Sequence, residues 1–328
     1  MAHELEMKAD GTAAMFSVKE TPWHGLGHVI QDAPSIERVL ELAGLNWGVK
    51  MEDLFLKDGT KTEQRAIMRD QPGAPLDRSI LGYSGERYKP LQNSEALDWF
   101  KPFVDSGLAS FETAGSLRDG QKIWIMCRLN KAEMEIVKGD SVRKYLMLSN
   151  GHDGITGIRV GFTPVRVVCA NTLAMCHNSG QSKLIRLMHS KKTIQNLEAI
   201  QNVVNAADAQ FEATAEQYRA LANKQINQKD IQAYVTKVFY NDAQAESDRE
   251  KSARDSLNET ITKLFEIGYG NEIPGAKGTA WALYNGATEY LSYVKGRTQD
   301  TRLDSLWFGT GKDLNQRAFD SALELVAA

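Results

Sequence analysis

Two thiols and an imidazole lie within nine residues of one another, in the segment CANTLAMCH from Cys169 to His177. Such side chains are metal ligands, but a structural zinc site takes four of them in paired short spacings. Here the two cysteines are seven positions apart, and Cys127 is the only other cysteine in the chain. On a helix, Cys169, Leu173 and Cys176 would share one face. We therefore expect buried thiols that pack as small apolar groups, and no metal site.

The same segment also allows covalent chemistry by a thiol. A cysteine at the start of a helix has its thiolate stabilised by the helix dipole, and Cys169 lies near such a predicted start. His152, His177 and Asp153 are conceivable partners for it in a thiol- or histidine-dependent enzyme. The chain has no P-loop, no GxGxxG motif, no HExxH and no GxSxG. ATP-driven and dinucleotide chemistry are therefore not expected, nor is any cofactor.

Positive side chains are concentrated in this region, although the whole chain has a net charge of −3. Some lie on an extended apolar run and the others follow it. Such a row could track the phosphates of a nucleic acid, with Phe162 or a nearby tyrosine as a surface for stacking. The alternative is a solvated face without a partner. The residues in question are Arg159, Arg166, Lys183, Arg186, Lys191 and Lys192.

The composition is that of an ordinary globular protein. Of 328 residues, 42% are apolar and 25% are charged, which excludes wholesale disorder and fibrous architectures. No run approaches the roughly 18 apolar residues of a membrane span, and the acidic, polar start of the chain lacks the apolar core of a signal peptide. Three cysteines are too few for a disulfide framework. We expect a cytoplasmic protein with reduced thiols and no membrane contact.

Sequential hairpins must position these residues in the N-terminal part. The clearest hairpin joins residues 110–117 and 121–129 across Asp119-Gly120, a dipeptide suited to a type I′ turn. Helices are predicted from Ser35 to Ala43 and from Asn93 to about Asp105, with Ser35 and Asn93 as N-caps. Hairpins that are not interrupted by helices favour an antiparallel sheet. Further extended segments are predicted at 46–56, 62–68, 80–90, 133–137, 141–149 and 158–168.

From Ser190 onwards the pattern is helical. Apolar residues recur every seven positions, and a second series lies three positions after the first, which predicts one long helix with a packing seam. The seam would pack within the chain or between chains. The two series are Leu197, Val204, Phe211 and Tyr218, and Ile200, Ala207, Thr214 and Leu221. Four further helices are predicted at 228–239, 248–265, 279–294 and 312–326. The predicted class is α+β, with an α+β domain over residues 1–187 and a helical domain over 188–328.

Four motifs along the chain together suggest a family. They are PWHGLG (Pro22–Gly27), TPVRVVCANTL (Thr163–Leu173), GTAWALYNGATEY (Gly278–Tyr290) and WFGTGKDLNQRA (Trp307–Ala318). With these motifs in the family's order, the chain resembles, over nearly its whole length, a family of phage- and plasmid-related proteins of unknown function. The resemblance implies a protein of a mobile element in the host cytoplasm, and no established reaction. Antiparallel hairpins followed by a helix also look like the core of single-strand annealing recombinases, by analogy of fold and context alone.

The cationic residues and this resemblance together favour a non-enzymatic protein that binds single-stranded DNA. It would act in phage or plasmid replication or recombination, by strand annealing among other routes, and would assemble as a homo-oligomer through the seam of the long helix. Two alternatives stay open. One is the thiol- or histidine-dependent enzyme centred on Cys169, and the other is a protein-interaction module that redirects a host factor.

Overall fold

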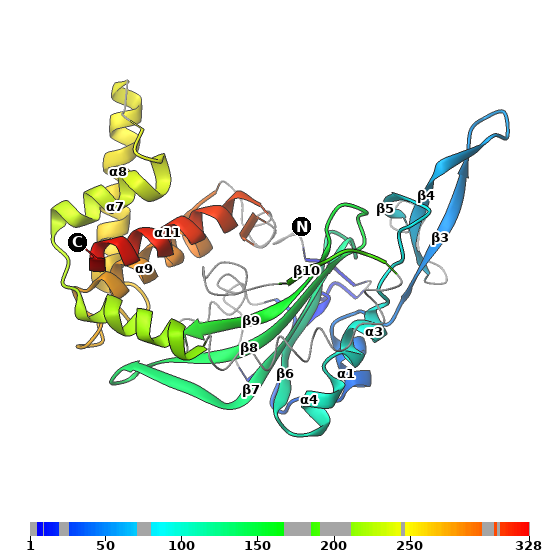
Figure 1. The fold of residues 1–328 in the computed structure, drawn as a ribbon, viewed down its shortest axis with the longest axis horizontal. Helices are drawn as coiled ribbons and strands as arrows, with labels where there is room; N and C mark the ends of the chain where they lie inside the picture. The colour runs from blue at the N-terminus through cyan, green and yellow to red at the C-terminus, as the bar shows by residue number, and fades with distance from the viewer. Residues whose placement is uncertain are drawn as a thin grey trace. The chain divides into compact units, whose positions relative to one another are not determined.

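The computed structural model confirms the predicted α+β class (Figure 1). It describes residues 5–8, 10–19, 26–70, 80–166, 185–190, 211–243, 247–296, 305–306 and 309–327. The chain divides into two compact units, and each takes three segments. No single position in the sequence therefore separates the two units. The first unit is Met1–Lys131, Tyr145–Phe162 and Leu184–Ala207, and the second is Ala132–Lys144, Thr163–Lys183 and Asp208–Ala328.

In the part of the chain that is described, the larger sheet has seven strands. They are β1 (Met15–Val18), β2 (His28–Ile30), β6 (Ala109–Leu117), β7 (Lys122–Val137), β8 (Asp140–Gly151), β9 (Ile158–Arg166) and β10 (Ile185–Leu187). Their order is β10-β9-β8-β7-β6-β1-β2. The pairs β1/β6, β6/β7 and β9/β10 are antiparallel, whereas β1 and β2 are parallel. The predicted hairpin is confirmed as β6 and β7, and its turn has positive φ at Arg118, Asp119 and Gly120.

A smaller sheet has the order β3-β4-β5. It consists of β3 (Gly48–Phe55), β4 (Lys61–Asp70) and β5 (Ile80–Gly85), and we call it the arm. The pairing of β5 with β4 starts at Gln64, opposite Gly85, so the part of β4 before Gln64 pairs with β3 alone. Figure 1 shows this two-stranded end extending beyond β5.

Among the described residues of the first unit there are three short helices: α1 (Ile36–Leu42), α3 (Asn93–Asp98) and α4 (Lys101–Asp105). The N-cap of α1 is Ser35, as predicted, and its side chain accepts a hydrogen bond from the backbone of Arg38. The prediction of one helix from Asn93 to Asp105 was wrong. Pro102, near the start of α4, has no N–H to continue an α-helical ladder from α3.

Asn93 was also wrongly predicted as a cap. The N-cap of α3 is Gln92, whose backbone N–H donates to Glu95 Oε2 at 2.9 Å. Asn93 is 1% exposed, and its amide nitrogen donates to the carbonyls of Leu45 and Trp47 at 3.1 and 3.2 Å. Its side chain thus links α3 to the segment that leads into the arm.

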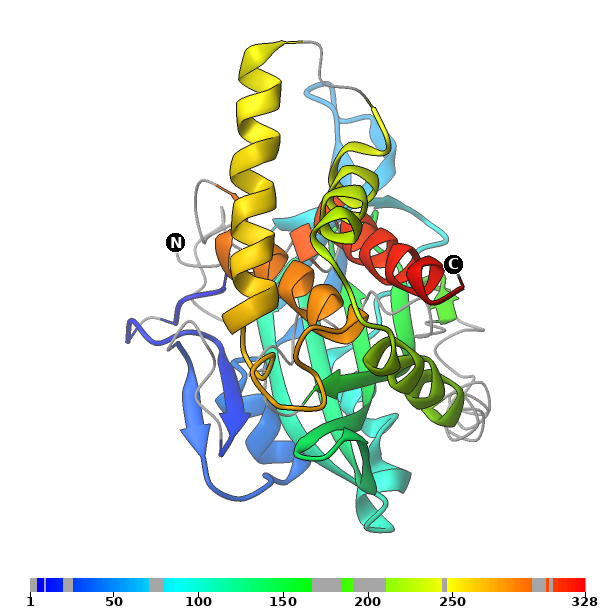
Figure 2. The ribbon, with the colours of Figure 1, turned by 90° about the vertical axis from the view of Figure 1, so that its left-hand side faces the viewer.

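Helices form most of the second unit. Residues 211–223 are helical, and they are followed by α7 (Gln228–Tyr240), α8 (Asp248–Ile267), α9 (Ala280–Glu289), the π-helix η2 (Tyr290–Val294) and α11 (Thr310–Ala327). In Figure 2, α8 (yellow), α9 (orange) and α11 (red) lie side by side. Among the described residues, no helix combines the length and the apolarity that a membrane span requires.

An aromatic core holds these helices together. The ring of Tyr218 lies 4.5 Å from that of Trp281 and 5.8 Å from that of Phe319. The described residues of the predicted seam, Phe211, Thr214, Tyr218 and Leu221, are all buried. The seam therefore packs within the second unit over this stretch, and its earlier residues, from Leu197 to Ala207, lie outside the described part of the chain.

Candidate functional site

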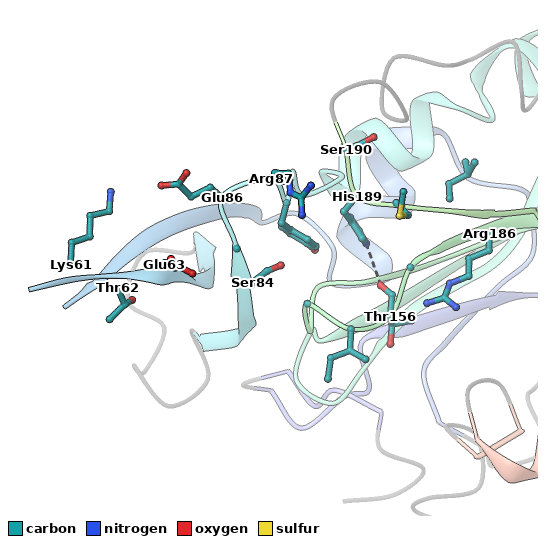
Figure 3. Close-up of a pocket in the computed structure, with 17 residues that line it drawn as sticks. Lys61, Thr62, Glu63, Ser84, Glu86, Arg87, Thr156, Arg186, His189 and Ser190 are labelled. Carbon is teal, nitrogen blue, oxygen red and sulfur yellow. Dashed lines mark hydrogen bonds between the residues drawn. The ribbon is translucent and has the colours of Figure 1, made fainter. Parts of the chain in front are cut away.

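An open cavity of about 1240 Å³ lies in the first unit, where the arm meets the loop between β8 and β9 (Figure 3). Four segments line it. They are residues 61–63 of β4, 84–88 at and after the end of β5, 154–157 of the β8–β9 loop, and 186–190 of β10 and the residues that follow it. The cavity thus unites segments that are far apart in the sequence.

Two glycines permit the close contact between the arm and the β8–β9 loop. A Cβ atom on Gly82 would lie 2.3 Å from the carbonyl oxygen of Asp153, and one on Gly154 would lie 2.1 Å from that of Tyr83. Gly154 also has a φ of +78°, which other residues adopt only with strain. Backbone therefore packs directly on backbone here, and the contact joins the arm to the β8–β9 loop beside the cavity.

Asp153 holds the β8–β9 loop in shape. Its Oδ1 accepts hydrogen bonds from the backbone N–H groups of Ile155 and Thr156 at 2.9 and 2.6 Å, and its Oδ2 accepts one from Thr156 Oγ1 at 2.7 Å. Such local bonds are typical of an aspartate that begins a turn. The carboxylate that was considered as a catalytic partner thus has a structural role.

His152 is completely buried beneath this loop. Its Nε2 lies 3.0 Å from Asn93 Oδ1. The same Nε2 lies 3.3 Å from the amide nitrogen of Asn150, so two buried amides hold this edge of the ring. Burial lowers the pKa of His152 to about 3 and keeps the ring neutral. A ring without access to solvent is poorly placed to exchange protons with a substrate.

Two predicted cationic residues come together at the edge of the larger sheet. Arg159 of β9 lies directly opposite Arg186 of β10, so both side chains are on the same face. Burial and, next, the charge of Arg186 lower the pKa of Arg159. Two like charges opposite each other disfavour the sheet unless an anion or solvent screens them. Arg186 is exposed, lines the cavity and forms no ion pair with any described residue.

A third arginine at the cavity was missed by the reasoning from sequence. Arg87 follows β5, is exposed, and likewise has no ion-pair partner among the residues that the structure describes. The only signal in the sequence was its position next to Tyr88, a basic residue beside an aromatic one. Because Arg87 is far from Arg159 and Arg186 in the sequence, spacing along the chain could not indicate that it lines the same cavity as Arg186.

Aromatic rings line the cavity beside these cations. His189 stacks on Tyr88, with ring centroids 4.5 Å apart and planes inclined by 29°. The His189 Nε2 lies 3.3 Å from the carbonyl oxygen of Thr156, to which it can donate when protonated (Figure 3). Burial lowers the pKa of His189. The pair forms a rigid aromatic wall that is joined to the β8–β9 loop.

The charges around the cavity are not evenly distributed. Lys61, Glu63 and Glu86 lie on the arm side, whereas Arg87 and Arg186 lie towards the larger sheet (Figure 3). Lys61 shares the carboxylate of Asp53 with Arg65, each at 2.8 Å, and Glu63 and Glu86 add negative charge on this side. The lining arginines that form no ion pair with a described residue lie on the side of the larger sheet.

The other predicted residues lie outside the described part of the chain, wholly or in part. Arg166 ends β9, but its side chain is not described. Five residues lie entirely outside the described part of the chain: Lys183, Lys191, Lys192, Cys169 and Cys176. Among the residues that are placed, no group of three or more His, Cys, Asp or Glu side chains could hold a metal ion. Cys127 is buried in β7, and burial raises the pKa of its thiol.

A family of unknown function covers most of the chain. The family DUF932, described as a domain of unknown function, matches residues 80–307. The match includes the β8–β9 loop, β10 and Arg87, but neither the PWHGLG motif nor most of the arm. No curated protein and no solved structure matches the chain.

Proposed function

Since the chain belongs to the DUF932 family, whose function is unknown, we propose its function from the geometry of the cavity: it binds single-stranded DNA there. The observation that carries the proposal is the pair Arg87 and Arg186, two exposed guanidinium groups at one cavity without an ion pair to any described residue. Guanidinium groups bind phosphate oxygens well because their N–H donors can form two parallel bonds.

The size of the cavity supports a polymer as the ligand. A volume of about 1240 Å³ exceeds the roughly 300–1,000 Å³ that is typical of small-molecule sites. The cavity is also open to solvent, so a strand could reach it from outside. Arg159, opposite Arg186, would extend the row of cations along the face of β9 and β10. That face would thus offer the phosphates of a strand two neighbouring guanidinium groups.

The context of this binding comes from the sequence resemblance. We place the protein in the cytoplasm of a cell that carries a phage or plasmid, where it would bind single strands during replication or recombination. Arg166, Lys183, Lys191 and Lys192 remain candidates for further phosphate contacts. Arg166 and Lys183 lie between Arg159 and Arg186 in the sequence, and Lys191 and Lys192 follow Arg186.

The experiment is a titration of a fluorescently labelled oligothymidine, followed by anisotropy at several salt concentrations. The double variant Arg87→Gln, Arg186→Gln should bind about 30-fold more weakly at about 0.1 M salt. Loss of two phosphate contacts should reduce the slope of log K against log salt by about 1.4, since each contact on a single strand contributes about 0.7.

The matched control is Arg249→Gln. Arg249 is an exposed arginine of α8 that does not line the cavity, so this variant removes the same charge from another place. It should bind like the wild type. The proposal is wrong if the wild type shows no salt-sensitive binding, or if the cavity variant binds as well as the control.

A further inference from the structure

Two large apolar side chains project into solvent at the rim of the same cavity. Ile155 of the β8–β9 loop is 84% exposed, and Met188, just after β10, is 80% exposed. An apolar side chain of this size gains about 1.5–3 kcal/mol when it is buried. A ligand that covered both side chains would therefore gain binding free energy from their burial.

Specific contacts hold the loop around Ile155, so the exposure of this side chain does not result from a loose loop. Asp153 Oδ1 accepts the backbone N–H of Ile155 at 2.9 Å, and Gly154 is packed on the backbone of the arm. The loop is thus held on both sides of Ile155. Met188 precedes His189, whose ring is stacked on Tyr88. Both apolar side chains are therefore next to residues that the fold holds in place.

The charge beside this rim indicates what would cover it. A ligand at the rim would meet Arg186 as well as Ile155 and Met188, so it must offer an anionic group and an apolar face. An unpaired nucleotide has both, in its phosphate and in the face of its base. In duplex DNA the base faces are hidden in the stack, and only the phosphates and the base edges are available.

We propose that Ile155 and Met188 contact unstacked bases of the bound strand and so determine a preference for single-stranded over duplex DNA. This inference rests on the proposed function, because it assigns the phosphates to Arg87 and Arg186. Apolar side chains read no hydrogen-bonding edge of a base, so the contacts tolerate any sequence, as base stacking does in other single-strand binding proteins.

The test compares three labelled ligands of equal length: oligothymidine, an abasic oligonucleotide with the same phosphates, and a duplex. The double variant Ile155→Ser, Met188→Ser should bind oligothymidine about 10-fold more weakly than the wild type, with the same salt slope. Its affinity for the abasic and duplex ligands should not change. The wild type should bind the abasic ligand about as weakly as the variant binds oligothymidine.

The matched control is Leu108→Ser. Leu108 is a 58% exposed apolar residue of the first unit that does not line the cavity, and thermal unfolding of all variants checks that they are folded. If salt-sensitive binding is intact but the rim variant binds oligothymidine like the control, the rim does not contact bases, and the proposed function stands. If the wild type binds no ligand in a salt-sensitive way, the proposed function fails, and the inference fails with it.

Discussion

Acidification from about pH 7.5 to about pH 5 should destabilise the folded protein by about 2 kcal/mol through His152 alone. The ring is completely buried, its Nε2 lies 3.0 Å from Asn93 Oδ1, and its Nδ1 has no hydrogen-bond partner among the described residues. A proton on Nδ1 would place an unpaired charge in the interior. The folded protein therefore resists protonation, whereas the unfolded chain does not.

The magnitude follows from the two pKa values. The pKa of His152 is 6.5 in an unperturbed chain and about 3 in the folded protein. The stability due to its neutral form is complete above about pH 6.5 and is lost progressively as the pH falls towards about 3. At about pH 5 the unfolded histidine is protonated about 30-fold in excess, and RT ln 30 is about 2 kcal/mol. His189, whose pKa is also lowered by burial, adds a loss of the same sign.

Urea denaturation at a series of pH values measures this loss, with the fluorescence of the tryptophans as the signal. The variant His152→Gln keeps a neutral donor in place of the ring. It should be less stable at neutral pH, but its free energy of unfolding should fall by about 2 kcal/mol less over the same range. Equal pH dependence in the wild type and in His152→Gln would refute the reasoning.

Two further substitutions test contacts within each of the two units, one substitution in each unit. Gly154→Ala should destabilise the protein by about 3 kcal/mol or more in urea denaturation, because the new Cβ would clash with the carbonyl oxygen of Tyr83. The control is Gly59→Ala, which is also at positive φ but in open space and should cost only about 1 kcal/mol. Equal losses of stability in the two variants would contradict this account of the contact between the arm and the β8–β9 loop. In the second unit, Trp281→Phe removes the indole N–H that donates to the buried carboxylate of Asp140 at 2.9 Å. The free energy of unfolding should fall by about 2 kcal/mol. A fall below about 0.5 kcal/mol would show that this hydrogen bond is dispensable.

Much of the secondary structure could be predicted because it is encoded locally. The Asp119-Gly120 turn between two extended segments indicated the β6/β7 hairpin, and Ser35 indicated the start of α1. The C-terminal helices α7, α8 and α11 follow the predicted spans within a few residues. Each of these features depends on residues within a few positions of one another, where spacing alone carries the information.

The sequence by itself therefore determined the α+β class, the β6/β7 hairpin and the helices α1, α7, α8 and α11, and it singled out Arg159 and Arg186. Only the tertiary structure decided that Arg87 joins Arg186 at one cavity and that His152 is buried and neutral. It also showed that the side-chain amide of Asn93 donates to the carbonyls of Leu45 and Trp47 and does not cap a helix. The physical reason is that burial and contacts between distant segments depend on how the whole chain packs, which no local spacing encodes.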